Sequence, residues 1–481
     1  MCIICVSTVT AASLLSPTQT VEPQNLEYKY VSTKKTCTKS KLNKTVGGKI
    51  CLKDGTKYRW FIKETSAKPI EKEQEVDTQK DVYSAPSVPT SDINLCKIKE
   101  VSRSRGMTGA GFPEWNSLTA KTGTVKWALI PIQFSDLSGE SNFKSRIIDQ
   151  TKMLSDWFFM ASDGKFKVEW VISDKWITIQ NSASSYNIAF SSNLNKELNG
   201  IRLFNDAMTA SDKSFDFTNI QTVNFILPNS QTFLKESSQG FPWDQAVKEF
   251  VTNEGKISSF SIPGTFFDQP GREYWSYWVH EFGHAIGLPH IGTSRPDPNG
   301  KINPINFNEL DIMGIQDVGK ELSGWLRFFI GWLSDERIYC KQSDQIENIQ
   351  LSLLPLSTQE DGLKLVIIPL SDTKAILIES RRINKFSCSR PNHDGVLVYT
   401  YNAELGHNED FLVQLVPAGR YPERTSCAGN DMVDPFLNEG DYVIIEGVKI
   451  KVIKQGSYDR IEINKDLNTK DLNYNKFPDR G

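Results

Sequence analysis

Between residues 125 and 228, the spacing of apolar residues changes several times, and each change predicts a new helix or strand. Residues 125–134 form an apolar run with few polar interruptions, which predicts a buried strand. Apolar residues then recur at helical spacing over 143–158, and residues 165–173 alternate as in a strand. A helix over 194–211 and a strand over 222–228 follow. Strands that alternate with helices predict an α/β or α+β domain.

Beyond about residue 345, short apolar or alternating runs replace this pattern, with turn residues between them. Such a series is typical of an all-β domain, and of a sandwich in particular. We therefore predict an α+β fold, with a domain of strands and helices over 94–345, a β-sandwich-like domain over 346–466 and a polar tail over 467–481. The predicted strands lie within residues 363–370, 374–380, 395–401, 411–417, 441–453 and 459–464.

Residues 25–63 predict a small lysine-rich module ahead of the main body. Its segment KICLKDGTKYRWFI (49–62) predicts two short strands joined at Asp54-Gly55, a strong hairpin signal. The basic face suits weak association with an anionic cell-wall polymer, although a solvated lysine face is the simpler explanation. Residues 64–93 are charged, contain Pro and Ser and offer few large apolar side chains, so we predict a flexible linker.

Composition and charge narrow the classes of function. Of the 481 residues, 39% are hydrophobic and 23% are charged, which is ordinary for a soluble globular protein. The formal net charge of −3 gives no reason to expect nucleic acid as a partner. No apolar run approaches the roughly 18 residues that a membrane-spanning helix needs. We therefore expect neither a nucleic-acid partner nor a membrane span.

The first residues of the chain predict export. Residues 1–24 contain a short apolar stretch, and Ala11 and Ala12 suit a signal-peptidase cleavage site. The basic residues that usually precede such a stretch are missing; a true start upstream of Met1 would explain this, and a merely apolar terminus is the alternative. Because the cysteine usage agrees with export, we predict a signal segment and a secreted, extracellular or cell-envelope location.

The cysteines predict structural disulfides. If Cys2 and Cys5 leave with the signal segment, six cysteines remain, and none belongs to a CxxC metal or redox pair. An even number in an exported protein favours disulfides, although the sequence does not decide the pairing. Short separations favour two pairs and leave a third: Cys37–Cys51 as a staple of the small module, Cys388–Cys427, and Cys96–Cys340.

The strongest chemical signal is the segment HEFGHAIGLPH, which holds three of the five histidines in the chain. On a helix, residues i and i+4 share a face, so His280 and His284 can direct both imidazoles at one ion. Gly287 tolerates a left-handed φ, so the helix can end there and the chain can turn. His290 can then return as a third nitrogen ligand. Three neutral imidazoles with one open position are typical of a catalytic zinc site.

This spacing, HExxHxxGxxH, resembles the signature of the metzincins, a clan of zinc endopeptidases. The clan has a second signature, a methionine turn, and here NELDIMGIQDVG supplies Met313, 23 residues after His290. By itself Met313 would suggest an ordinary core residue; the resemblance implies that it lies beneath the histidines as an apolar floor. It also implies a catalytic domain built on a twisted mixed sheet with long helices, closed by a helix over 319–333.

Further stretches resemble the immune inhibitor A family of secreted bacterial metallopeptidases. These are MLSDWFFMASDGKFKVEWVISDKWITI (153–179), DIMG followed by GWL, and AILIESRRINKF with DGVLVYTYN in the β domain. The likeness covers about residues 120–460. One departure is that no tyrosine follows Met313 closely, where some metzincins carry one that helps to hold the oxyanion. Tyr274 and Tyr277 are candidates for that task, or are simply aromatic residues on the helix surface.

The sequence thus predicts a secreted zinc endopeptidase. Glu281 stands beside the first histidine and is the expected general base, while one catalytic Zn²⁺ is expected on His280, His284 and His290. Proteins or peptides are the expected substrates, lying extended against an edge strand of the sheet. Two alternatives stay open: an envelope-associated binding or structural protein with a residual zinc site, and a zinc amidase acting on peptidoglycan cross-links.

Two weaker signals complete the list of candidate residues. Asp297 and Asn299 in RPDPNGKI faintly resemble a calcium loop, but the later acidic ligand is missing, so a simple turn is favoured over Ca²⁺. His393 and His407 lie in the β domain at no ligand spacing, and we predict surface or loop positions for both.

Overall fold

The computed structural model divides the chain into two compact units, Met1–Asp81 and Val82–Gly481. The residues whose structure is described are 28–30, 38–39, 45–46, 49–54, 57–63, 92–102, 109–114, 117, 119–186, 193–234, 239–240, 250–257, 259–262, 264, 273–292, 307–316, 320–387, 394–417, 419–420 and 433–466.

The first unit is a small antiparallel sheet. Its strands are arranged in the order β1-β4-β3-β2, with every neighbouring pair antiparallel. The predicted hairpin is confirmed, because β3 and β4 pair from Lys49↔Ile62 to Asp54↔Lys57. Cys51 is buried and disulfide-bonded. The strands are β1 (Tyr28–Tyr30), β2 (Thr45–Val46), β3 (Lys49–Asp54) and β4 (Lys57–Lys63).

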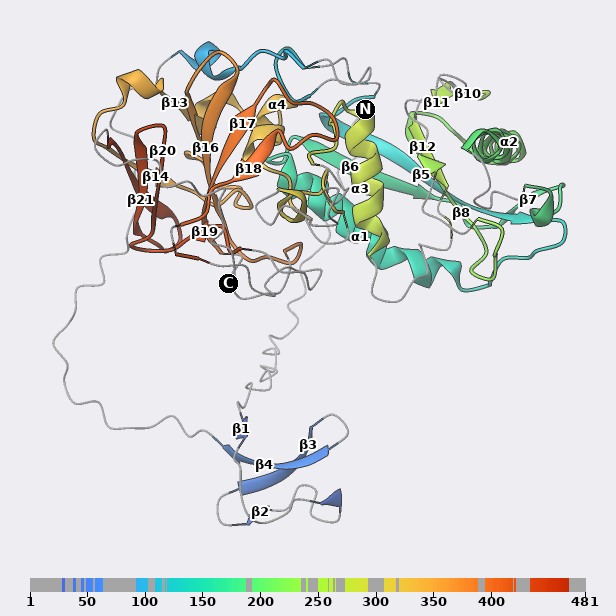
Figure 1. Cartoon of the computed structure of the whole chain (residues 1–481). Helices are drawn as coiled ribbons and strands as arrows, with labels where there is room; N and C mark the ends of the chain where they lie inside the picture. Colours follow the sequence, from blue (N-terminus) through green and yellow to red (C-terminus); the bar gives the residue numbers. More distant parts are fainter. Residues whose placement is uncertain are drawn as a thin grey trace, which may run out of the picture. The chain divides into compact units, whose positions relative to one another are not determined.

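The second unit begins with a mixed sheet in the order β6-β5-β8-β12-β9 (Figure 1). The first four strands are parallel, and β9 joins the edge antiparallel to β12. A short strand, β7, continues the pairing of β5, and β10 pairs with β11 alone. The strands are β5 (Gly123–Phe134), β6 (Phe166–Ile172), β7 (Ile177–Ile179), β8 (Ile220–Ile226), β9 (Gln239–Gly240), β10 (Phe250–Val251), β11 (Lys256–Ile257) and β12 (Ser259–Ile262).

Both faces of this sheet are covered, which explains the nearly continuous apolar run of β5. Successive side chains of a strand point to opposite faces. Trp127 and Leu129 therefore join the core under α1 (Phe143–Ala161) and α3 (Tyr274–Ala285). Their neighbours Ala128 and Ile130 join the core under α2 (Asn193–Ser211). The helices and strands predicted between residues 125 and 228 are confirmed, with ends shifted by a few residues.

The C-terminal part consists of two sheets that share one apolar core. The first has the order β13-β15-β16-β17-β18, with β19 also on β17, and the second has the order β14-β22-β21-β20. Inward residues from both, among them Ile376 and Ile461, form a common buried cluster. The predicted β-rich C-terminal half is thus observed. The strands are β13 (Ile338–Cys340), β14 (Ile349–Leu353), β15 (Leu365–Pro369), β16 (Lys374–Arg381), β17 (Gly395–Asn402), β18 (Leu412–Gln414), β19 (Phe436–Leu437), β20 (Tyr442–Ile445), β21 (Val448–Lys454) and β22 (Asp459–Lys465).

The mixed sheet and the C-terminal sheets are joined by a continuous core. One hydrophobic cluster runs from Trp127 of β5 through Phe282 of α3 to Tyr399 of β17. The predicted disulfide between Cys96 and Cys340 is confirmed, with a Cα–Cα distance of 6.0 Å. As a result, α3 lies between the mixed sheet and the C-terminal sheets (Figure 1). The α+β class is observed. The domain boundary predicted at residue 345 does not divide the second unit, because this core contains residues from both sides of it.

The helix predicted over 319–333 is wrong in length. Within the described part of this segment, 320–333, only α4 (Gly324–Phe329) is helical. Its first turn is capped by Ser323, whose side chain accepts from the Leu326 N–H. It ends before Gly331, which has a φ of 78° and cannot extend a right-handed helix. The apolar residues beyond it are buried by packing into the shared core rather than by a longer helix.

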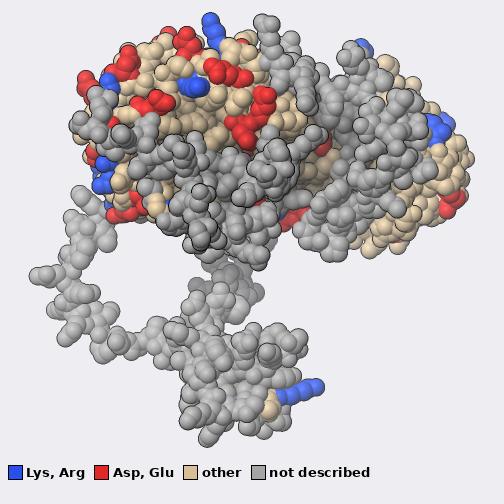
Figure 2. Space-filling model, viewed as in Figure 1, with Lys and Arg blue, Asp and Glu red and all other residues tan. Residues whose placement is uncertain are grey.

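The helices and the charged surface residues can be compared with what a membrane span or a nucleic-acid partner would require. No helix in the described part of the chain combines the length and apolar character needed to cross a bilayer. Figure 2 shows acidic and basic side chains interspersed on the described part of one face, without an extended basic area there. That distribution agrees with the low net charge.

Several predictions fall outside the described residues and stay predictions. They concern the signal segment at 1–24, most of the linker at 64–93, the Asp297 and Asn299 turn, His393, the tail at 467–481, and Cys37, Cys388 and Cys427.

Candidate metal site

Helix α3 carries the first two histidines on its partly buried side. Trp275, Trp278 and Phe282 anchor the helix in the core between the sheets. With 3.6 residues per turn, His280 and His284 fall on one side of this helix, one turn apart. His280 is 3% exposed, and His284 is partly buried at the last turn. These apolar side chains therefore hold the helix in position, and the helix backbone places the two imidazole rings on the same side.

The end of α3 turns the chain toward the third histidine. The N–H of Gly287 donates to the carbonyl of His284 at 3.1 Å, and the N–H of Leu288 donates to that of Gly283 at 2.9 Å. These two bonds with a left-handed residue form a Schellman motif. Gly287 has a φ of 98°, so the structure places a left-handed glycine where the sequence suggested one. Two residues beyond Leu288, His290 reaches back to the helix.

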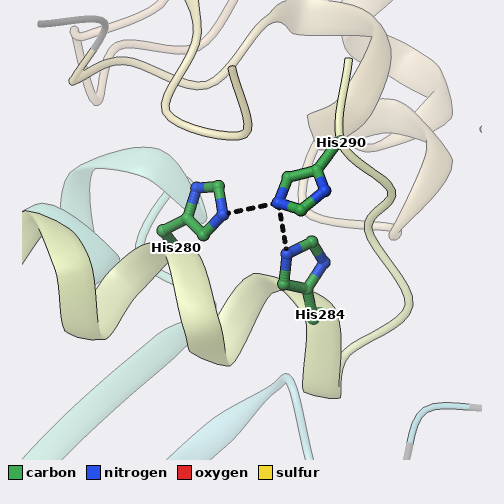
Figure 3. A group of neighbouring side chains, drawn as sticks. All are labelled: His280, His284 and His290. Atoms are coloured by element: carbon green, nitrogen blue, oxygen red, sulfur yellow. Dashed lines mark hydrogen bonds between the residues drawn. The ribbon is translucent and has the colours of Figure 1, made fainter. Parts of the chain in front are cut away.

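The three imidazoles meet at one point (Figure 3). The Nε2 atom of His290 lies 3.0 Å from that of His280 and 3.1 Å from that of His284. Among the described residues, these three are the group of His, Cys, Asp or Glu side chains placed to hold a metal ion, with candidate ligand atoms within 4.8 Å of one another. The structure thus brings together the three residues that the sequence proposed as ligands.

The outer nitrogens of the first two rings show which nitrogen faces the centre. His280 Nδ1 lies 2.7 Å from the carbonyl oxygen of Ile312, and His284 Nδ1 lies 2.8 Å from that of Leu288. A carbonyl only accepts, so both Nδ1 atoms carry the proton and both Nε2 atoms offer a lone pair. Burial lowers the pKa of His280 to about 4 and that of His284 well below its usual range. Neutral rings with converging lone pairs suit a cation.

The nitrogen spacing fits zinc. Imidazole nitrogens bind Zn²⁺ at about 2.0–2.1 Å, and tetrahedral geometry then separates two nitrogens by about 3.3 Å. The observed 3.0 and 3.1 Å separations need only a few tenths of an ångström of adjustment. Burial also lowers the pKa of His290 to about 3, so all three rings are neutral at pH 7. The donor set is three nitrogens with no fourth protein ligand among the described residues.

Glu281 follows His280 on α3 and is partly buried. Its side chain lines a small cavity with Thr222 and Ser259 of the mixed sheet, and Tyr277 donates a hydrogen bond to its carboxylate. Burial raises the pKa of Glu281 to about 7, and the bond from Tyr277 opposes that rise. The sequence left Tyr274 and Tyr277 as candidate oxyanion donors or surface residues. Tyr274 is 3% exposed and stacks on Tyr277 with ring centroids 5.6 Å apart, so it is neither on the surface nor open to a substrate.

Met313 lies directly against the helix that carries the histidines. It is fully buried, and a Cβ built on Gly283 would stand 2.5 Å from its Sδ atom. The glycine between the two histidines is therefore what lets the thioether approach the helix backbone. The same turn supplies the Ile312 carbonyl to His280, and the Met313 carbonyl accepts from the Ile291 N–H at 3.2 Å. Met313 thus packs against the helix at the glycine between the two histidines.

The turn around Met313 is held by a buried carboxylate. Asp311 accepts from the Met313 N–H at 2.8 Å through one oxygen and from the Ser323 N–H at 2.7 Å through the other. Burial raises the pKa of Asp311 to about 6. Arg381 of β16 adds a long-range support, since its Nη1 donates to the Leu310 carbonyl at 2.6 Å. Nothing in the sequence pattern singled out either residue.

A fourth histidine, which the sequence did not connect with the site, lies next to the third. His407 lies in the loop between β17 and β18, as predicted, but it also contacts the metal centre. The N–H of His290 donates to its Nδ1 at 3.1 Å, and its Nε2 lies 3.4 Å from His290 Nδ1. Its distance of 117 residues along the chain gave no signal of this contact.

The chain matches no protein-family model and shows no significant similarity to a curated protein.

Proposed function

We propose that this protein is a zinc-dependent endopeptidase of the metzincin type, resembling the immune inhibitor A family. One observation carries the proposal: three imidazoles converge through Nε2, a glutamate follows the first of them on the same helix, and a buried methionine packs against that helix. His280, His284 and His290 would hold the metal. When bound, zinc supplies a lowered pKa for water, towards about 7, and polarisation of the scissile carbonyl.

The protein's own residues account for the remaining steps. In its ionised form the Glu281 carboxylate accepts a proton from the attacking water and then returns it to the leaving amine. Its raised pKa, about 7, suits both halves of this transfer near neutral pH. Tyr277 orients the carboxylate through its hydrogen bond. Tyr277 is therefore a positioning residue in this proposal, not an oxyanion donor.

The substrate would be a protein or peptide in extended form. The mixed sheet ends at β9, which pairs antiparallel with β12, and β12 is the strand of this edge that α3 contacts. Addition of an extended segment to a sheet edge supplies backbone hydrogen bonds that do not depend on sequence. We place the substrate along this edge, as the sequence-based hypothesis did.

We also propose that the protein acts outside the cytoplasm. The disulfide between Cys96 and Cys340, and the disulfide-bonded state of Cys51, support an oxidising compartment. The lysine-rich module at 25–63 is proposed to contribute weak cell-wall association.

The test compares wild type with Glu281→Gln, which keeps the shape of the side chain but removes the base. We expect casein hydrolysis to fall by about 10²- to 10⁴-fold, while the bound zinc, measured by elemental analysis, stays at one per chain. Chelation should abolish wild-type hydrolysis.

Parallel gels with casein, gelatin and cell walls separate the alternatives. Activity on cell walls alone would favour a peptidoglycan amidase. Zinc binding without activity on any of the three would favour a binding or structural protein with a residual site. Wild-type turnover by Glu281→Gln would overturn the role of Glu281.

A further inference from the structure

We propose that the dipeptide His407–Asn408 positions the third metal ligand, so that the C-terminal β sheets are an integral part of the metal site. This inference rests on the proposed zinc site. It assigns to the β17–β18 loop a role that is separate from the ligands themselves and from Glu281.

The dipeptide contacts every polar group of His290 other than the Nε2 atom that faces the centre. The backbone N–H of His290 donates to His407 Nδ1 at 3.1 Å. Its backbone carbonyl accepts from the Asn408 N–H at 3.2 Å. Its outer nitrogen, Nδ1, lies 3.4 Å from His407 Nε2, but this approach is not a hydrogen bond when His290 Nε2 faces a metal, because both of these nitrogens then carry a proton. The Asn408 side chain also forms a hydrogen bond with the His290 side chain. The two rings lie 4.7 Å apart and 37° from parallel.

The loop that carries this dipeptide is well anchored. Ala403 and Phe411, at its two ends, are buried, and the Asn402 N–H donates to the Phe411 carbonyl at 3.0 Å. Inside the loop, the Gly406 N–H donates to the Glu409 carboxylate at 2.7 Å. Asn408 itself has a φ of 60°, a left-handed conformation that asparagine tolerates better than most residues. These contacts let the loop act as a fixed support.

The third ligand needs such a support more than the others do. His280 and His284 lie on a helix, and their outer nitrogens face carbonyls of the Met313 turn and of the helix exit. His290 lies beyond the end of α3, in a segment (288–292) that belongs to no helix or strand. Partners of the outer ring nitrogen fix ring orientation, and their loss typically lowers metal affinity about 10- to 100-fold.

The test uses three substitutions at one position. His407→Asn keeps an acceptor near the place of Nδ1, His407→Phe keeps a ring without an acceptor, and His407→Ala removes both. We expect zinc affinity, measured by competition with a chromogenic chelator, to fall in that order, with a loss of about 10- to 100-fold for His407→Phe. Glu404→Ala, an exposed change in the same loop, is the matched control and should bind as wild type does.

A second readout reports the geometry of the ligands. After substitution of cobalt for zinc, the visible absorption bands of His407→Phe should differ from those of wild type, while Glu404→Ala should leave them unchanged. Melting of the metal-free proteins shows whether the fold is intact; we expect shifts of only a few degrees.

The outcomes separate this inference from the proposed function. Equal zinc affinity and equal cobalt spectra for wild type and His407→Phe would overturn the role of the dipeptide and leave the peptidase proposal in place. Failure of the wild-type chain to bind zinc would overturn both. Partial recovery of affinity in His407→Asn relative to His407→Phe would support the acceptor role specifically.

Discussion

Two kinds of contact hold the three histidines, and they differ in how far along the chain the partners lie. The orientation of His284 depends on nearby residues, through the helix and the Gly287 turn. The Met313 turn and His290 depend on distant strands, through Arg381 of β16 and His407 of the β17–β18 loop. Local contacts orient His284, whereas contacts with distant segments of the chain orient His280 and His290. Three substitutions test this difference.

The largest effect is expected from Arg381→Met, which removes a long-range support. Arg381 is 4% exposed and pairs with Glu379, which is fully buried. Loss of the guanidinium would leave that carboxylate uncompensated, although the Gly324 N–H and the Tyr399 hydroxyl still donate to it. We expect the free energy of unfolding to fall by about 3–5 kcal/mol, measured by urea denaturation.

The double variant Arg381→Met with Glu379→Gln is the control. It removes the buried charge on both sides and should recover part of the lost stability. If the urea midpoint of Arg381→Met equals that of wild type, Arg381 of β16 does not support the Met313 turn.

A smaller effect is expected from Asp311→Ala within the turn itself. The Met313 and Ser323 N–H groups would lose their acceptor in a buried position. Each unsatisfied donor costs about 1–3 kcal/mol, so two donors allow a range of about 2–6 kcal/mol. We expect a total in the lower part of that range, about 2–4 kcal/mol, measured by thermal or urea unfolding. Zinc affinity should fall as well, because the same turn orients His280.

The titration of Asp311 gives a second measurement on the same residue. Burial raises its pKa from 3.8 to about 6, so the folded protein binds this proton more tightly than the unfolded chain does. The resulting stabilisation is complete below about pH 3.8 and is lost as the pH rises through about 6. The stability of wild type relative to Asp311→Asn, which does not titrate, should fall over this range. A constant difference would contradict the raised pKa.

The smallest effect is expected from Gly287→Ala, which tests the local contact. At a φ of 98° an alanine is strained, and we expect a loss of about 1–2 kcal/mol with a weaker metal site. Gly255→Ala is a matched control, since a Cβ there would meet no neighbour and its φ is not left-handed. Equal stability of Gly287→Ala and wild type would show that the helix exit is not under this constraint.

The sequence predicted most of the local structure correctly. The spacing of apolar residues predicted β5, α1, β6, α2 and β8, because one strand or helix face needs only its own periodicity to be recognised. In the C-terminal part it predicted β15 to β18 and β20 to β22 but missed the short strands β13, β14 and β19. The left-handed turn at Gly287 followed from residue type. The Cys96–Cys340 pair, which is observed, was the pair left over after the shorter separations had been assigned. The long helix expected over 319–333 was wrong, because buried apolar residues in irregular structure resemble a helical pattern.

The residues of the site also fall into two groups, those that the sequence predicted and those that only the structure identified. The spacing HExxHxxGxxH was sufficient to propose His280, His284, His290 and Glu281, since helical geometry alone brings the first two rings together. Asp311, Arg381 and His407 were not predicted as supports. Each acts through a contact with a residue on another element, and the position of that residue depends on how the sheets pack.

The sequence by itself therefore determined the elements, the chemical identity of the candidate ligands and the turn that returns the third one. Only the tertiary structure decided what holds them: the approach of Met313 to Gly283, the carboxylate of Asp311 and the loop at His407. The physical reason is the distance along the chain over which each effect acts. Periodicity and backbone preferences act over a few residues, whereas the support of His290 comes from a strand connection 117 residues away that only the shared core brings near.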